Sequence, residues 1–253
     1  MKDLRHLFCL ALFALNLSGC DRPGASAVPL TSGRVPPILL FNGTGTSPND
    51  VAAIETLMEK NRISYSTASS TQLDEMSAAR LRTYRLIIVP GGDFTRIGTG
   101  LKKDTAAKLR DAVQHGLNYL GICAGAFFAG RTPYNGLNLT SGVQFSFYSA
   151  EARGGRKAAV PISGAGTPTL DQYWEDGPQL TGWGAVVGRY PDGTPAVVQG
   201  QSGDGWIILT GIHPEAPESW RGGMDFTTPA SVDHAYAVTL IRSALERRPM
   251  PHF

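Results

Sequence analysis

Short apolar runs alternate with helical patterns along the first half of the chain. Three of the runs are continuous and of strand length, as in strands covered on both faces: Ile38–Phe41, Leu86–Val89 and Leu117–Ile122. Helical periodicity lies between them, from about Asn49 to Lys60 and from Lys103 to Gly116. This alternation predicts an α/β fold with a doubly wound, mostly parallel, flavodoxin-like sheet in a single domain.

The remaining elements are less regular. The segment "ISYSTAS" predicts a short strand, and residues 71–84 predict a helix with Thr71 and Asp74 in its first turn. Asn49 or Asp50 is expected to cap the first helix. After Gly130 we expect short strands near residues 157–162, 186–190, 196–199 and 206–211, and a closing helix over residues 231–246.

The N-terminus has the pattern of an export signal. "MKDLRHLFCLALFALNLSGC" places Lys2 and Arg5 before an apolar run from Leu7 to Leu17. That run is about half of the ~20 residues that a membrane-spanning helix requires. "LSGC" resembles the lipobox of bacterial lipoproteins, which implies cleavage before Cys20 and lipidation of its thiol. The alternative is an ordinary secretory signal in which this cysteine occurs by chance.

The lipobox resemblance sets the expected organisation of the chain. Residues 1–19 are a signal peptide, 20–37 a flexible tether rich in Pro, Gly and Ser, 38–248 the domain and 249–253 a tail. The resemblance implies a lipid-anchored protein of the bacterial cell envelope that faces the periplasm. Asp21, directly after the modified cysteine, favours the inner membrane.

Composition removes one class of partner. The chain is 42% hydrophobic and 17% charged, and its net charge is +2 without a block of basic residues. We therefore expect no nucleic-acid partner. The basic run Ala152–Lys157 is interpreted as a solvated loop, with a grip on an acidic substrate as the alternative. No cofactor, metal ion or oligomeric state is predicted.

Cysteine usage leaves one thiol to explain. Of the three cysteines, Cys9 lies in the signal and Cys20 is expected to carry lipid, so Cys123 has no partner for an internal disulfide. A lone cysteine in an exported protein is a buried small hydrophobe, a site of intermolecular pairing, or a reactive nucleophile.

Three expected strands end in residues that could take part in catalysis or ligand binding. Pro90-Gly91-Gly92-Asp93 follows one, Cys123 ends the next, and His213-Pro214-Glu215 follows the strand near 206–211. Ligands of parallel sheets bind at the carboxyl ends of the strands. If the three strands are neighbours, their ends meet in one cleft.

Cys123 stands in the sequence G-I-C-A-G, which has the form of a nucleophile elbow. A helix is expected to begin beside the sulfur, and its N-terminal dipole and free amides favour a thiolate. The amide of Ala124, with one from the Gly91-Gly92 turn, is expected to stabilise an oxyanion. A glycine-flanked cysteine is also found as a simple tight-packing site.

Of the five histidines in the chain, His213 is the one expected at the end of a core strand. It is the candidate proton shuttle, and Glu215 is placed to orient its imidazole. Each motif is weak by itself, since H-x-E is common and Pro-Gly-Gly is usually a turn. Their conjunction after three buried strands favours a catalytic site.

"GICAGAF" followed by "HPE" resembles the class I glutamine amidotransferase-like superfamily. "ILLFNGTGTS", "LIIVPGGD" and "GLNYLGICAGAFFAG" resemble more narrowly the amidotransferase-like module at the N-terminus of some biotin–protein ligases. The resemblance implies Cys123 as nucleophile, His213 as base and Glu215 as orienter. It implies Gly92 and Ala124 at the oxyanion.

The resemblance also places Gly91, Asp93 and Phe127 beside the substrate. Glutamine-hydrolysing members often carry Gln where this chain has Phe127, and a phenyl ring makes none of the hydrogen bonds of an amide.

The leading hypothesis is a thiol hydrolase or acyl transferase acting on a small-molecule or peptide amide. A second hypothesis is an inactive binding or scaffold protein that uses the same cleft, with Gly130–Gly136 and the four tryptophans as a ligand surface. A third is a peptidase of the PfpI-like branch, whose members usually place histidine where Ala124 stands.

Overall fold

The computed structural model describes residues 36–148 and 157–253. The predictions for Cys9, Cys20 and most of Ala152–Lys157 lie outside these residues. Within them, no helix has the length and apolar character needed to span a membrane.

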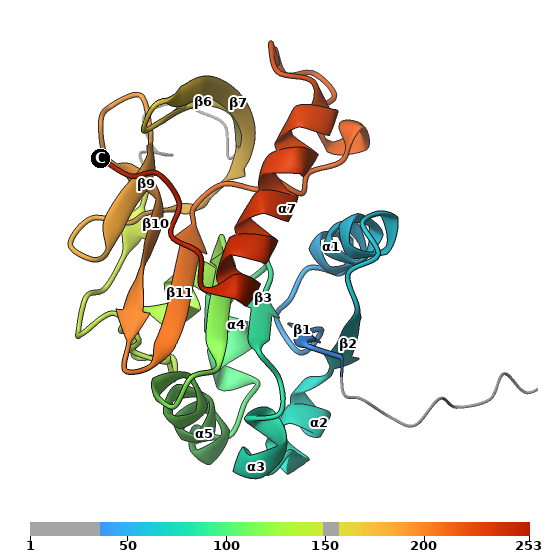
Figure 1. The fold of residues 1–253 in the computed structure, drawn as a ribbon, viewed down its shortest axis with the longest axis vertical. Coiled ribbons are helices and arrows are strands. Elements are labelled where there is room, and N and C mark those ends of the chain that lie inside the picture. The colour runs from blue at the N-terminus through green and yellow to red at the C-terminus, as the bar shows by residue number, and fades with distance from the viewer. Residues whose placement is uncertain (1–35, 149–156) are drawn as a thin grey trace, which may run out of the picture. The chain divides into compact units, whose positions relative to one another are not determined.

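A nine-stranded mixed sheet forms the centre of the domain (Figure 1). One half is parallel and has the order β2 (Tyr65–Ala68), β1 (Ile38–Phe41), β3 (Leu86–Val89), β4 (Asn118–Ile122), β11 (Gly205–Thr210). The other half is antiparallel and continues with β10 (Pro195–Ser202), β9 (Ala185–Arg189), β6 (Lys157–Gly164), β7 (Thr167–Glu175). A separate pair joins β5 (Ser146–Phe147) to β8 (Pro178–Gln179).

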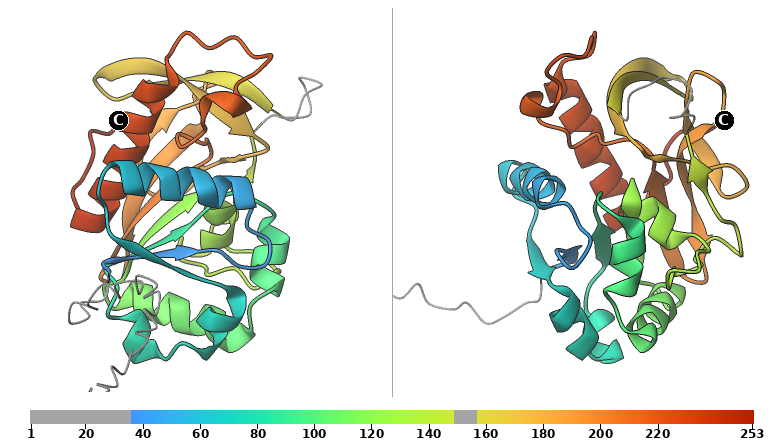
Figure 2. Two further views of the ribbon diagram at one scale, coloured as in Figure 1. Left: turned by 90° about the vertical axis from the view of Figure 1, so that its right-hand side faces the viewer. Right: turned by 180° about the vertical axis from the view of Figure 1, so that it is seen from behind.

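Helices cover both faces of the sheet (Figure 2). On one face, α1 (Pro48–Lys60) and α7 (Ala230–Glu246) pack in a core with Ile38, Leu40 and Ile88. On the other face lie α2 (Ser70–Glu75), α3 (Ala78–Leu81), α4 (Phe94–Thr99), α5 (Lys103–Gln114) and α6 (Ala124–Ala129). The three continuous apolar runs are buried because both of their faces meet such a core. The doubly wound α/β fold class is therefore confirmed.

Local capping differs from expectation at two helices. Ser47, rather than Asn49 or Asp50, caps α1 and accepts from the Asp50 amide, because its extended backbone precedes Pro48. The expected helix over residues 71–84 is two helices, since extended Met76 interrupts it and Ser77 caps the second.

The long strand β7 was not predicted. Its polar and partly exposed sequence, "TPTLDQYWE", lacks the apolar signal of a buried strand, and β6 pairs with it along most of its length. Tyr173 in β7 also forms an isolated bridge with His213.

Candidate active site

The three strands that end in candidate residues are neighbours in the sheet. β4 pairs in parallel with β3 on one side and with β11 on the other. Their carboxyl ends therefore meet, as expected from the sequence. The amide of Cys123 donates to the Thr210 carbonyl across 2.8 Å, which joins the end of β4 to the end of β11.

Cys123 is held in a strained conformation at the turn between β4 and α6. Its φ is 49° and its ψ is −104°, in a region that non-glycine residues rarely occupy. The flanking glycines allow close packing: a Cβ on Gly125 would lie 1.9 Å from the Val89 carbonyl oxygen, and one on Gly121 would lie 2.6 Å from that of Gly125. The structure thus has the geometry of a nucleophile elbow.

The sulfur of Cys123 is largely covered. The residue is 6% exposed, and its Sγ lies 3.5 Å from the Glu175 carbonyl oxygen, to which the thiol donates. Among the described residues, the sulfur forms this one hydrogen bond, and it forms none with His213. Glu175 ends β7, so the antiparallel half of the sheet also reaches the site.

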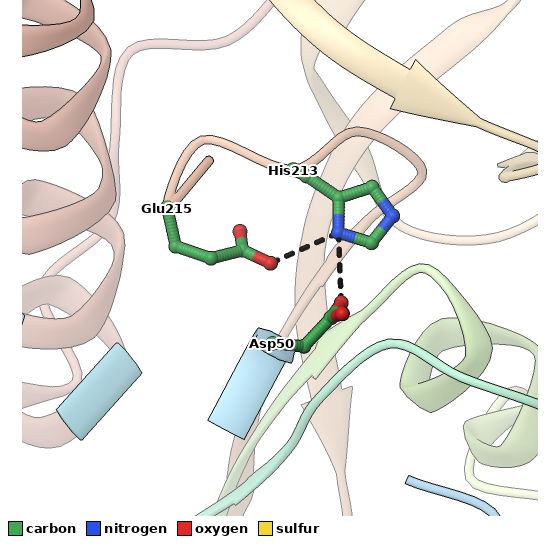
Figure 3. Close-up of side chains that lie close together, drawn as sticks. All are labelled: Asp50, His213 and Glu215. Carbon is green, nitrogen blue, oxygen red and sulfur yellow. Dashed lines mark hydrogen bonds and ion pairs between the residues drawn. The ribbon is translucent and has the colours of Figure 1, made fainter. Parts of the chain in front are cut away.

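The imidazole of His213 faces two buried carboxylates (Figure 3). Its Nδ1 lies 2.9 Å from Oε1 of Glu215, with hydrogen-bond geometry, and 3.1 Å from Oδ1 of Asp50. His213 is 5% exposed, Glu215 1% and Asp50 6%. The other ring nitrogen points away from both carboxylates and remains for a different partner.

Asp50 was not predicted as a site residue. It is the third residue of α1, directly beyond the loop after β1, and from the sequence it was expected only as a helix cap. A signal was nevertheless present, because Asp50 follows the end of a buried strand as the other candidates do. Since β1 is next to β3, its loop opens on the same edge of the sheet.

The two carboxylates act differently on the imidazole. Nδ1 of His213 has hydrogen-bond geometry with Glu215, and within the described residues Asp50 Oδ1 has no hydrogen-bond partner. Asp50 therefore contributes its charge across a short ion-pair distance. Removing an atom from water costs free energy when no hydrogen bond replaces the hydration, so this arrangement is held by the fold around it.

The charges of this cluster are strongly coupled. Burial alone lowers the pKa of His213, but the nearby Cys123, Glu215 and Asp50 raise it well above its usual value. Burial raises the pKa of Asp50, but the nearby His213 charge, together with hydrogen bonds from Ser47 and the backbone, lowers it. Burial raises the pKa of Glu215, with the charge of Asp50 adding to it. The arrangement favours an imidazolium.

The Gly91-Gly92 turn lies against this cluster. A Cβ on Gly91 would lie 2.1 Å from Asp50 Oδ1 and 2.6 Å from His213 Cε1. Gly92 has a φ of 138°, is exposed, and forms an isolated bridge with Thr46. Only glycine fits this close approach at position 91. Ala124, the other predicted oxyanion residue, begins α6.

The two remaining predicted substrate residues have structural partners. Asp93 caps α4, and its Oδ1 accepts from the amides of Thr95 and Arg96. Phe127 lies one turn after Cys123 on α6 and stacks on Phe94, with ring centroids 4.7 Å apart and planes at 24°.

One group of described residues offers donors in the arrangement of a metal site. Atoms of Asp50, His213 and Glu215 lie within 4.8 Å of one another. Three protein ligands are enough for a catalytic zinc ion. However, the shared atom is Nδ1 of His213, which carries a proton when the imidazole is charged, and a protonated nitrogen cannot bind a metal. Metal binding and the charged imidazole therefore exclude each other.

Comparison with known proteins agrees with the motifs. Residues 37–156 match the family model "Biotin-protein ligase, N terminal". The biotin–protein ligase of Schizosaccharomyces pombe is 24% identical over 163 residues, which are 51% of this chain and 25% of the ligase. The chain thus corresponds to about a quarter of that relative's length.

Two further relatives cover more of their own length. The pyridoxal 5'-phosphate synthase subunit PdxT of Caldivirga maquilingensis is 28% identical over 182 residues, 64% of this chain and 83% of that protein. A solved structure described as a GMP synthase component from Thermoplasma acidophilum aligns with a TM-score of 0.53 at 10% identity, covering 83% and 95% of the two chains. In sequence over residues 37–156 and in fold, the chain is similar to proteins of the class I glutamine amidotransferase-like superfamily.

Proposed function

We propose that this protein is a thiol-dependent hydrolase or acyl transferase that acts on an amide, with Cys123 as nucleophile, His213 as proton shuttle and Glu215 as its orienter. The observation that supports this most strongly is the strained backbone of Cys123 beside the strand that leads to a carboxylate-bound histidine. Strain of this kind persists where the surrounding structure maintains it, and it is concentrated at functional sites.

The proposed reaction has two steps. The thiolate of Cys123 attacks the amide carbonyl, so a C–S bond forms while the carbonyl oxygen becomes an oxyanion. The imidazolium of His213 gives its proton to the amide nitrogen, and the C–N bond breaks. The amine leaves, and the acyl group stays on Cys123 as a thioester. His213 then removes a proton from water or an acceptor amine, which attacks the thioester and restores the thiolate.

Backbone amides are proposed to stabilise the oxyanion. The first amide of α6, at Ala124, and the exposed turn at Gly92 are the candidate donors. Positive φ at Gly92 is compatible with an amide that turns toward a ligand.

Free glutamine does not fit the substrate side of this site. Phe127 is 6% exposed and lies in a stack of aromatic rings, so it offers no hydrogen bond to a glutamine substrate. We therefore propose an amide other than glutamine.

For the location, we propose a lipid anchor on Cys20 that holds the domain in the periplasm. The support is the sequence "LSGC" after an apolar run of signal-peptide length. Membrane fractionation of the full chain and of Cys20→Ser tests this: release of the variant from the membrane fraction supports the anchor, and equal partition of both contradicts it.

Burial of the thiol favours a second candidate function, a binding protein without turnover. Cys123 is 6% exposed and its sulfur donates to the Glu175 carbonyl rather than to His213. In enzymes such hydrogen bonds often form only when substrate is bound. In the binding protein, ligand would associate reversibly and leave Cys123 unmodified.

Mass spectrometry separates the two functions. The full chain is incubated with cell-envelope extract, and intact protein is compared with Cys123→Ala. An acyl adduct on Cys123 that is absent from the variant supports the thiol enzyme. A ligand that co-purifies equally with both proteins, with no adduct, supports binding alone.

A further inference from the structure

An aromatic cavity of about 490 Å³ lies beside the candidate site. Its volume falls within the range of about 300–1,000 Å³ that is usual for small-molecule pockets. Five aromatic residues line it: Phe94, Phe127, Tyr134, Phe145 and Phe147. Neither Cys123 nor the Asp50, His213 and Glu215 cluster is part of its wall, so the cavity is separate from these residues.

The walls of this cavity come from the same loops that form the candidate site. Phe127 follows Cys123 by one turn, and its amide donates to the Cys123 carbonyl across 3.2 Å. Phe94 begins α4 directly after the Gly91-Gly92 turn and its capping Asp93. Phe127 and Phe94 therefore each follow, in the chain, one of the segments that carry a candidate oxyanion donor.

The third wall is also connected to the thiol. Phe147 in β5 pairs with Pro178 in β8. β8 follows β7, whose last residue, Glu175, accepts the hydrogen bond of the Cys123 sulfur. This wall therefore belongs to a segment that leads to the hydrogen-bond partner of Cys123.

The aromatic rings pack on one another, and two of them leave part of their surface exposed. Phe127 lies between Phe94 and Phe147, with centroid separations of 4.7 and 4.8 Å. Phe147 is 48% exposed and Tyr134 43%, and they are two of the four large hydrophobic side chains that are exposed in the described part of the chain. Exposed aromatic rings gathered in a hollow are typical of ligand-binding surfaces.

Arg131 adds a positive charge to the cavity wall. It is exposed, and its guanidinium forms no ion pair with any described residue. A guanidinium binds a carboxylate through two parallel hydrogen bonds. An anionic group on the ligand therefore complements this wall.

We propose that this cavity binds the acyl side of the substrate: an amide whose acyl group carries an aromatic side chain and a carboxylate, with the ring against the exposed surfaces of Phe147 and Tyr134 and the carboxylate at Arg131. This substrate class rests on the proposed function of Cys123. Recognition of such a substrate depends on aromatic contacts and one charge, whereas recognition of glutamine requires hydrogen bonds to its side-chain amide.

The test compares alkylation of the full chain by chloromethyl ketones of N-succinyl-phenylalanine and N-succinyl-alanine, each rate being divided by the iodoacetamide rate of the same protein. In this reaction the sulfur forms a bond to carbon and chloride leaves. The phenylalanine reagent is expected to react at least tenfold faster at Cys123, because burial of the ring stabilises the complex by about 1.4 kcal/mol or more. Equal normalised rates would overturn the proposal.

Variants locate the preference. Phe147→Ala and Tyr134→Ala, both at exposed rings, are expected to reduce it severalfold, whereas Phe253→Ala, at an exposed ring outside the cavity, is expected to keep it. Arg131→Gln is expected to remove any advantage of succinyl over acetyl reagents. A preference unchanged by Phe147→Ala, Tyr134→Ala and Arg131→Gln contradicts the cavity as its source.

A binding measurement separates this inference from the proposed function. Calorimetric titration of Cys123→Ala with N-succinyl-phenylalanine amide requires no reactive thiol. Binding that weakens in the double variant with Phe147→Ala supports the cavity even if Cys123 proves inert. Absence of binding, together with a reactive Cys123, overturns the cavity and leaves the thiol chemistry in place.

Discussion

Nδ1 of His213 lies 3.1 Å from Oδ1 of Asp50, which comes from the first helix of the domain. The same nitrogen donates to Glu215, so two buried carboxylates act on one imidazole. A Cys-His-Glu triad needs only one of them. The second places an additional negative charge beside the proton shuttle and makes Asp50 a positioning residue for the proposed reaction.

Replacing Asp50 by Asn is expected to lower the pKa of His213. The pKa is raised overall because the charges of Cys123, Glu215 and Asp50 outweigh burial, and Asn removes one of these charges at nearly constant shape. The imidazolium should then lose its proton at a lower pH than in the wild type. Titration of ¹⁵N-labelled histidine by NMR measures this midpoint. Asp204→Asn, at an exposed turn, is the control, and an unchanged midpoint in Asp50→Asn would contradict the assignment.

Replacing Gly91 by Ala is expected to disrupt the site. The new Cβ would lie 2.1 Å from Asp50 Oδ1 and 2.6 Å from His213 Cε1, so the two side chains must separate. Gly222→Ala is the matched control, because a Cβ there meets nothing within 4 Å. We expect Gly91→Ala to remove the His213-dependent reactivity of Cys123, with the control unaffected. Wild-type reactivity in Gly91→Ala would show that this contact does not hold the site together.

Stability is expected to fall as pH rises because of Asp233. Burial raises the pKa of this carboxyl to about 7, although Arg221 acts in the opposite direction. A carboxyl with a raised pKa holds its proton longer in the folded state, so stability decreases between about pH 4 and 7. Asp233→Asn retains an acceptor for Gln172 and removes the charge.

Thermal unfolding at pH 5 and pH 8 measures this effect. We expect Asp233→Asn to reduce the loss of Tm between the two pH values by a few degrees, as a change of about 1 kcal/mol does in a domain of this size. Asp225→Asn, at an exposed position, serves as the control. An unaltered pH dependence in Asp233→Asn would contradict the raised pKa.

Chelation is expected to leave the activity of Cys123 unchanged. The proposed reaction uses Nδ1 of His213 as a hydrogen-bond donor, and a metal ion would require that atom without its proton. Alkylation rates with and without EDTA, followed by addition of Zn²⁺, provide the measurement. Loss of reactivity with EDTA that Zn²⁺ restores would identify Asp50, His213 and Glu215 as metal ligands instead.

The centre of the parallel half of the sheet was predictable because β1, β3 and β4 are buried on both faces. Continuous apolar runs at β1, β3 and β4 carry a strong signal, and Cys123, Gly91 and His213 could be located from the ends of the strands. β7 could not be found in this way. It pairs at the outer edge of the sheet, where polar residues are tolerated, so its sequence does not differ from that of a loop.

Tertiary contacts of polar residues were the other limit. Asp50 has the sequence context of a helix N-terminus, and only the placement of β1 next to β3 brings it to His213. Phe127 was recognised as a departure from a glutamine site. The cavity around it also needs Phe147, which is placed by the pairing of β5 with β8, and these two-residue strands have no sequence signal.

The pH dependence of Cys123 alkylation by iodoacetamide tests the central claim most directly. We predict that alkylation remains fast at pH 6.5 in the wild type, and that His213→Ala lowers the rate by up to about 100-fold, because an ordinary cysteine with a pKa near 8.5 is about 1% thiolate there. A wild-type profile that follows an ordinary thiol and does not change in His213→Ala would contradict catalysis by this site.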